Sequence, residues 1–257
     1  MLAKTVVIYL TASIKVSPIM PQLKLIDSEV RLRESSRGIN KFAKNLHSSI
    51  KIVVGENTGC ANLLKSRVNK NVQIIACPPP NPELISAGKA ACWVDETIFT
   101  LESDAFPKGD LILCANSKNY ISNWQYLLKR LPNHAENAIW FVKHTRAIDP
   151  LLFLINKEVF LDFLYRAREA YTEEIKNKKN GEIISFNSDT FLASYLLECG
   201  QSVFVWNSAP VRAGLSGTYG VGNSFFSEAR FIQYGSQLHD TIRQLGRKKF
   251  SDSRYNQ

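Results

Sequence analysis

The sequence predicts an α/β fold with a mainly parallel, twisted sheet flanked by helices and an irregular C-terminal part. Short runs of β-branched and apolar residues alternate with segments of helical periodicity, which is the order of elements in βαβ units. The first run, residues 5–10 (TVVIYL), is apolar almost throughout, as in a strand buried on both faces of a parallel sheet. The 257 residues, 45% of them hydrophobic and 21% charged, suffice for one large core or two small ones.

The first half of the chain contains most of the predicted sheet. Its strands are residues 5–10, 50–54, 72–76 and 110–114. One helix lies within residues 27–48, where apolar residues recur at near-helical spacing behind Asp27, whose carboxylate is a suitable N-cap. A second helix spans residues 86–101.

The second half is less regular. We expect strands at residues 138–142, 151–155 and 202–206, a long helix from about residue 157, and a short helix at residues 190–198. From about residue 225 the tail is predicted to be a basic helix that ends in LGRKKF. Such a tail can touch anionic lipid, or it can be a solvated basic end.

Composition narrows the classes of partner and excludes several kinds of protein. The formal net charge of +9, from 32 Lys and Arg against 23 Asp and Glu, suits nucleic acid, nucleotide phosphates or an anionic membrane surface. Five cysteines without a CxxC pair argue against a zinc ribbon and a complete disulfide framework. No run approaches about 18 apolar residues, so no conventional transmembrane helix is expected. The apolar N-terminus is interpreted as a strand and not as a signal peptide, which predicts a cytoplasmic protein.

Polar loops follow three of the predicted strands. Parallel sheets bind ligands outside the carboxyl ends of their strands, so these loops are expected to converge on one site. Glu56 and Asn57 can pair with a base edge or ribose hydroxyls, and Lys118 can neutralise a diphosphate. The alternative is that GENTG is only a turn and Lys118 only a solvated charge. The candidate residues of these loops are Thr11, Ser13, Glu56, Asn57, Ser117 and Lys118.

A Gly-Lys pair, Gly88 and Lys89, is expected to open a helix. Glycine lets the backbone approach a ligand, and the first amides of a helix bind phosphate. The segment is not a P-loop, because the second glycine and the GK[ST] ending are missing.

The order of five segments resembles a family of bacterial glycosyltransferases with a GT-A-type (Rossmann-like) fold. The segments are TASI, DSEVRL, IVVGENTG, GKAACWVDETI and LILCANSKNYISN. They are similar to the lipopolysaccharide and O-antigen group that lacks the metal-binding DXD motif. The resemblance covers about residues 5–125 and thins to PVRAGLSG at 210–217. One departure is Glu96, which falls eight residues after Gly88.

The resemblance implies donor binding without a divalent metal or other cofactor. The position of DXD reads CANSK, without a carboxylate. A leaving diphosphate needs positive charge, which Lys or Arg must then supply. The candidates are Arg31, Lys89, Lys118, Arg146 and Arg212.

An inverting transferase also needs a carboxylate to deprotonate the acceptor hydroxyl. In FNSDTFLASYL, Asp189 stands at the expected helix start, and it is the first candidate for this base. The alternative is that Asp189 only caps the helix. Glu96 is the second catalytic candidate, and Asp95 and Asp104 are further alternatives.

These observations predict a single GT-A-like domain over residues 1–257, with a nucleotide-binding half at 1–135 and an acceptor-side half at 136–257. The predicted reaction moves a hexose from a nucleotide-sugar donor, a UDP-sugar in the first instance, to a glycan or lipid-linked acceptor of bacterial surface polysaccharide, with inversion. Peripheral membrane contact and other polysaccharide-assembly enzymes are candidate partners, and nucleic acid is not an expected one. The alternatives are a nucleotidylyltransferase, a nucleic-acid-binding protein and an inactive sugar-binding domain.

Overall fold

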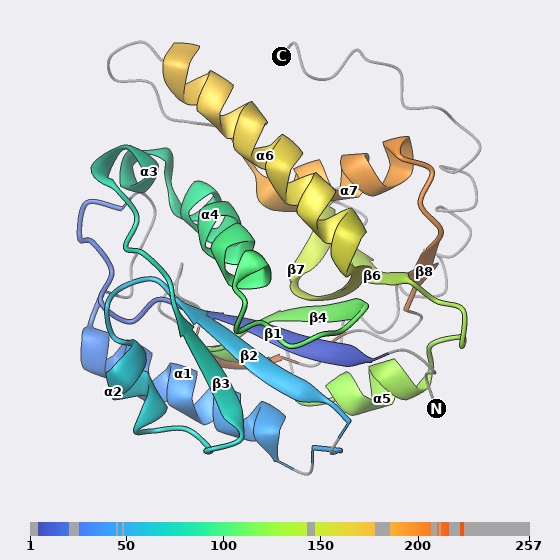
Figure 1. Ribbon diagram of the computed structural model, residues 1–257, viewed down its shortest axis with the longest axis horizontal. Helices are drawn as coiled ribbons and strands as arrows, with labels where there is room; N and C mark the ends of the chain where they lie inside the picture. Colours follow the sequence, from blue (N-terminus) through green and yellow to red (C-terminus); the bar gives the residue numbers. More distant parts are fainter. Residues whose placement is uncertain are drawn as a thin grey trace.

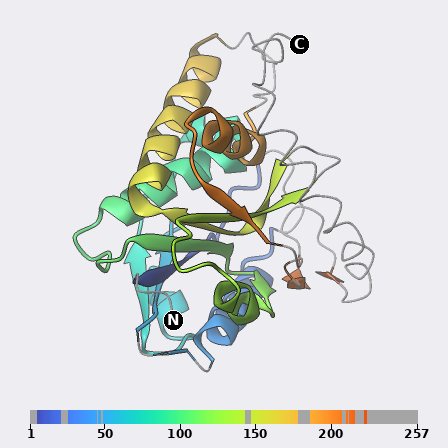
Figure 2. The same cartoon turned by 90° about the vertical axis from the view of Figure 1, so that its right-hand side faces the viewer.

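A computed structural model describes residues 5–20, 26–44, 46–47, 49–142, 147–177, 186–206, 210, 212–215 and 222–223. Three layers are visible in Figures 1 and 2: helices α1, α2 and α5 cover one face of a central sheet, and α3, α4, α6 and α7 cover the other. The helices are α1 (Ser28–Ala43), α2 (Ala61–Lys65), α3 (Pro82–Ala87), α4 (Lys89–Glu102), α5 (Trp124–Lys129), α6 (Lys157–Asn177) and α7 (Ser188–Glu198). Within these described ranges, no helix is both long enough and apolar enough to cross a membrane.

The described strands form one large sheet and one small one. The large sheet has the order β3-β2-β1-β4-β7-β6-β8, and the small one has the order β10-β9-β5. The strands are β1 (Val6–Ala12), β2 (Lys51–Glu56), β3 (Val72–Ala76), β4 (Leu111–Asn116), β5 (Asn119–Ile121), β6 (Asn137–Val142), β7 (Ala147–Asn156), β8 (Val203–Val205), β9 (Arg212–Leu215) and β10 (Gly222–Asn223). Strands β3, β2, β1 and β4 are mutually parallel, whereas β7 runs antiparallel to β4 and to β6. The predicted α/β class with a mainly parallel sheet flanked by helices is confirmed.

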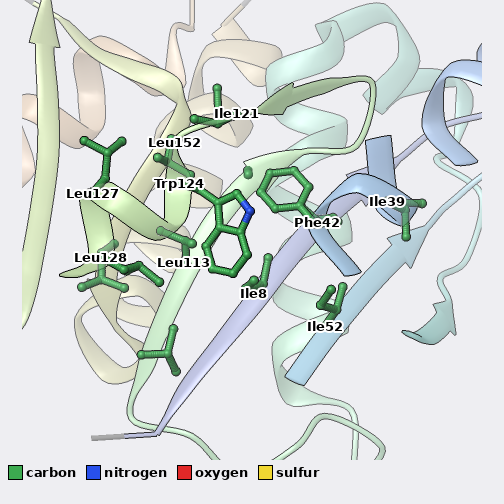
Figure 3. Packing of buried hydrophobic residues seen from close by; sticks show 14 of the residues in the cluster. Ile8, Ile39, Phe42, Ile52, Leu113, Ile121, Trp124, Leu127, Leu128 and Leu152 are labelled. Carbon is green, nitrogen blue, oxygen red and sulfur yellow. The ribbon is translucent and has the colours of Figure 1, made fainter. Parts of the chain in front are cut away.

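The apolar run of β1 divides its side chains between two cores. Val7 and Tyr9 point into the core under α4 and α6, whereas Ile8 and Leu10 join the core under α1 and α5. Figure 3 shows the second core, where the rings of Phe42 and Trp124 lie 5.9 Å apart. A strand buried on both faces has no polar side to alternate, which is why its sequence is continuously apolar.

The strand order reverses beside β1, and this reversal positions the candidate site. The chain leaves β1 through α1 to reach β2 on one side, and it later returns through α4 to place β4 on the other. Helices α1 and α4, which make these two connections, lie on opposite faces of the sheet. In doubly wound sheets this switch point is where the ligand crevice opens.

Local sequence signals predicted several elements well. Strand β3 begins and ends at the predicted residues. Helix α1 is capped by Asp27, whose Oδ1 accepts a hydrogen bond of 2.8 Å from the Val30 backbone N–H. The helix predicted over residues 86–101 is present, but it begins only at Lys89, and residues 86 and 87 belong to α3. Gly88, with a φ of 98°, ends α3 and precedes α4, because a left-handed residue cannot continue a right-handed helix.

The elements missed by sequence reasoning are short. Helix α2 has five residues and strand β5 has three, which is less than the two turns or several alternations that periodicity needs. Strand β9 was missed because its partner β5 is about ninety residues away in the chain. The predicted basic helix from residue 225 lies outside the described residues.

Gly38 lets α1 approach the end of β4, and replacing it should destabilise the fold. A Cβ at Gly38 would lie only 1.8 Å from the Ser117 carbonyl oxygen, so the helix or the strand would have to move. We expect Gly38→Ala to lower the free energy of unfolding by about 3 kcal/mol, measured by chemical denaturation. Arg37→Ala, an exposed position on the same helix, is the control and should change it by less than about 0.5 kcal/mol. Equal effects of the two substitutions would contradict the close approach.

Candidate functional site

The loops after β1 and β2 are joined by side-chain hydrogen bonds. Ser13 Oγ donates to Asn57 Oδ1 over 2.9 Å. The backbone N–H groups of Ile14 and Lys15 donate to Thr58 Oγ1 over 3.1 and 3.0 Å. We call these three bonds the loop junction. Two of the three polar loops that the sequence indicates therefore meet at the carboxyl ends of their strands.

Glu56, predicted to contact the donor, holds its own loop together. Its side chain is fully buried, at 0% exposure. Oε1 accepts from the backbone N–H and the hydroxyl of Thr58, and Oε2 accepts from the Cys60 N–H over 2.7 Å. Most of the acceptor capacity of the carboxylate is thus used inside the loop. Thr58 was missed by sequence analysis, because no residue pattern in the loop indicated it.

Arg31 connects α1 to the loop after β1. It lies in the first turn of α1, and its Nε donates to the Ser13 carbonyl oxygen over 2.7 Å. Only 3% of the residue is exposed, and burial lowers the pKa of its guanidinium to about 10. The helix is anchored by Leu32, Ile39 and Phe42, so the backbone of Arg31 is fixed relative to the sheet.

Lys118 is a buried cation just beyond β4. The residue is 7% exposed, and its backbone N–H donates to Asn116 Oδ1 over 2.9 Å. Burial lowers the pKa of its ammonium group to about 7, with nearby Arg31 and Lys89 lowering it further and Glu96 opposing them. The expectation that Lys118 is only a solvated charge is therefore wrong.

Glu96 is a buried carboxyl on α4. It is 5% exposed, and its Oε1 has no hydrogen-bond partner among the described residues. Burial raises the pKa of Glu96 well above its usual range, and the neighbouring Glu56 raises it further. A hydrogen bond with the Ala12 backbone and the charge of Lys118 act in the opposite direction. A Cβ on Gly55 would come within 3.0 Å of Oε1, so glycine at this position leaves room for the carboxyl.

Lys89 and Glu96 occupy the same side of α4. They are seven residues apart, which is close to two helical turns. Both contribute to the pKa of Lys118, so this side of α4 faces the end of β4. Gly88 ends α3, and the new helix α4 begins at Lys89. We call Arg31, Lys89, Glu96 and Lys118 the charged cluster.

The remaining first-half candidates contribute to packing around the charged cluster. Ser117 is fully buried, and its Oγ donates to Ser35 Oγ on α1 over 3.2 Å. Its backbone N–H donates to the Thr11 carbonyl oxygen over 3.3 Å. These bonds tie β1, β4 and α1 together directly beside Lys118.

The structure does not bring Asp189 into the charged cluster. Asp189 lies in the first turn of α7, which packs on β7 and α6. The cap of this helix is Asn187, whose Oδ1 accepts from the N–H groups of Asp189 and Thr190, so the alternative that Asp189 caps the helix is wrong. Among the described residues, Asp189 is not one of the charges that shift the pKa of Glu96 or Lys118.

Two predicted cations are not described at the level of their side chains. The backbone of Arg212 pairs with that of Ile121 in the small sheet, three residues after Lys118. Arg146 lies outside the described residues. In the part of the chain that is described, no three His, Cys, Asp or Glu residues are grouped as a metal site requires. Metal independence stays a prediction.

The charged cluster contains positive charge and lies at the edge of the sheet where an anionic ligand is expected to bind. Lys118 interacts electrostatically with the cations Arg31 and Lys89 and with the carboxyl of Glu96, whose pKa is raised. Burial strengthens the field of Arg31 and Lys118, because little water is present to screen them, whereas Lys89 is exposed. The arrangement can hold phosphate groups and stabilise negative charge that develops during bond cleavage.

Comparison with known proteins gives only distant similarities. No protein-family model and no curated protein sequence matches the chain. A solved 4-diphosphocytidyl-2C-methyl-D-erythritol synthase from Anaerococcus prevotii is 9% identical, with a TM-score of 0.43 over 92% of this chain and 96% of that one. A proposed nucleotide-diphospho-sugar transferase from Desulfovibrio desulfuricans is 11% identical, with a TM-score of 0.47 over 79% of each chain. The glycosyltransferase GlyE from Streptococcus pneumoniae is 10% identical, with a TM-score of 0.44 over 79% of this chain and 45% of that one. Similarities of this size assign neither an activity nor a substrate to this chain.

Proposed function

We propose that this chain is a transferase that binds a nucleotide-activated sugar through its diphosphate. The observation that carries the proposal is the burial of Arg31 and Lys118 together at the switch point of the sheet. Buried cations are rare unless an anionic group pairs with them. A bound diphosphate would bring negative charge next to these buried cations.

The chemistry of transfer suits such a site. When the bond between the sugar and the diphosphate breaks, negative charge accumulates on the leaving phosphate oxygens. Lysine and arginine side chains that are already held in place stabilise this charge without reorganisation. They would take the role that a divalent metal plays in enzymes with the DXD motif.

The finer assignments rest on the motif resemblance. The donor is proposed to be a UDP-hexose, and the acceptor a glycan or lipid-linked glycan of bacterial surface polysaccharide. Asp189 is proposed as the base that deprotonates the acceptor, which gives inversion at the sugar carbon, and Glu96 is the competing candidate. A peripheral contact with the inner face of the cytoplasmic membrane would bring a lipid-linked acceptor within reach.

A thermal-shift screen tests the proposal directly. We expect UDP or a UDP-sugar, at about one hundred times its Kd, to stabilise the chain by about 2.7 kcal/mol, which raises Tm by about 5–10 °C. The shift should persist in EDTA, because the predicted site uses side-chain cations. Uridine, which lacks the diphosphate, is the control ligand and should shift Tm much less.

Other outcomes identify the competing functions. Release of pyrophosphate from a nucleoside triphosphate in the presence of a sugar phosphate would favour a nucleotidylyltransferase. Stabilisation by single-stranded DNA but by no nucleotide would contradict the proposal and favour a nucleic-acid-binding protein. Donor binding without transfer to any acceptor would favour the inactive sugar-binding alternative.

A further inference from the structure

We propose that Thr58 is a positioning residue, whose hydroxyl fixes the loop after β1 and thereby holds Arg31 in place for an anionic ligand. The inference rests on the proposed function, because it needs an anion at this edge of the sheet. The inference assigns Thr58 an indirect role in binding, since Thr58 does not itself touch the ligand.

The hydroxyl of Thr58 has its full set of hydrogen bonds. A hydroxyl has one proton to donate and two lone pairs to accept with. The proton goes to Glu56 Oε1, and the lone pairs accept from the backbone N–H groups of Ile14 and Lys15. These partners come from two loops that are more than forty residues apart in the sequence.

Glu56 holds Thr58 in the orientation that this arrangement needs. Its carboxylate accepts from the backbone N–H as well as the hydroxyl of Thr58, and it is fully buried. The hydroxyl proton is therefore directed at Glu56, and both lone pairs face the loop after β1. Serine at position 58 preserves every one of these bonds, whereas valine, which has the same shape, removes all three.

The path from Thr58 to Arg31 is short. Ser13, the residue before Ile14, accepts the hydrogen bond from Arg31 Nε through its carbonyl oxygen. Ser13 is also held through its own hydroxyl by Asn57. Loss of the Thr58 bonds would leave two backbone N–H groups without their acceptor, and the segment that carries the Ser13 carbonyl would be free to move. The Nε of Arg31 would then lose its bond to the Ser13 carbonyl oxygen, and the guanidinium would be held less firmly.

The test uses the full chain, Thr58→Val and Thr58→Ser, with inorganic pyrophosphate and UDP as probes in titration calorimetry. We expect Thr58→Val to raise the Kd of both probes about tenfold, since a hydrogen bond to a charged group is of this size. Thr58→Ser should bind like the wild type. Amide hydrogen exchange should show faster exchange at Ile14 and Lys15 in Thr58→Val only.

Thr97→Val is the matched control. Thr97 is a buried threonine on α4 whose hydroxyl is bonded to Tyr9 and to the Trp93 carbonyl oxygen, away from the loop junction. The Thr97→Val substitution should lower Tm without changing the Kd of pyrophosphate. If Thr58→Val does not fold, Thr58→Ala is measured in its place, because it also lacks the hydroxyl.

The outcomes separate this inference from the proposed function. If the wild type binds both probes and Thr58→Val binds them equally well, the positioning role is refuted and the proposed function stands. A parallel loss of affinity in Thr58→Val and Thr97→Val would also refute it, because the effect would then follow stability alone. If the wild type binds neither probe, the proposed function fails and the positioning role fails with it.

Discussion

Lys118→Met is expected to make the fold more stable and the anion site much weaker. Burial lowers the pKa of the Lys118 ammonium from 10.5 to about 7, which means that the folded chain disfavours its charge. Methionine keeps the long side chain without the charge, so unfolding by denaturant should require more free energy. Loss of the cation should raise the Kd of pyrophosphate or UDP about tenfold to hundredfold.

The stability gain in Lys118→Met should depend on pH in a defined direction. The pKa of Lys118 is lower in the folded state, so between about pH 7 and 10.5 the unfolded chain binds more protons than the folded one. The burial penalty of wild-type Lys118 is therefore complete below about pH 7 and declines as the pH rises towards 10.5. The difference in unfolding free energy between Lys118→Met and the wild type should be largest at pH 6 and smallest near pH 10.

The same lysine makes ligand affinity pH-dependent. In the wild type, affinity for pyrophosphate should fall as the pH rises through about 7, because Lys118 loses its charge there. The ionisable groups that act on it are Arg31, Lys89 and Glu96. Lys118→Arg is the matched control, since a guanidinium stays charged, and its affinity for pyrophosphate should change less between pH 6 and 8.

The stability measurement has its own contradicting outcome. If the wild type has a larger free energy of unfolding than Lys118→Met at pH 6, the argument that burial disfavours the Lys118 charge is wrong.

Asp189→Asn is expected to reduce kcat by about two to four orders of magnitude while leaving donor binding intact. The substitution removes the proton acceptor but keeps the shape of the side chain. Helix α7 should be unaffected, because Asn187 and not Asp189 provides its cap. The measurements are kcat with a saturating donor and the Kd of UDP.

Glu96→Gln is the comparison that identifies the base. If Asp189 deprotonates the acceptor, Glu96→Gln should retain most of kcat, whereas a larger loss in Glu96→Gln than in Asp189→Asn would move the base to α4.

The stability of the Glu96→Gln variant gives an independent readout. Because the pKa of Glu96 is raised in the folded chain, the folded state binds more protons than the unfolded one above about pH 4.5. Glu96→Gln should therefore stabilise the fold progressively as the pH rises above that value.

The elements that sequence predicted are those controlled by neighbouring residues. Strand β3 is bounded by polar and proline-rich segments, and α1 begins where Asp27 accepts from Val30 three residues later. The break at Gly88 is also local, but glycine is compatible with either helix or turn, so the sequence alone did not reveal it. Short elements such as β5 were missed because their pairing partner is distant in sequence.

The chain's own residue pattern determined the α/β class, the buried character of β1 and the convergence of polar loops at one edge of the sheet. Only the tertiary structure decided what those polar residues do. It turned Glu56 into a support for its own loop, gave Thr58 a role that no pattern indicated, and buried Lys118 beside Arg31 and Glu96. The physical reason is that hydrogen-bond partners and pKa shifts depend on groups that folding brings together from distant segments.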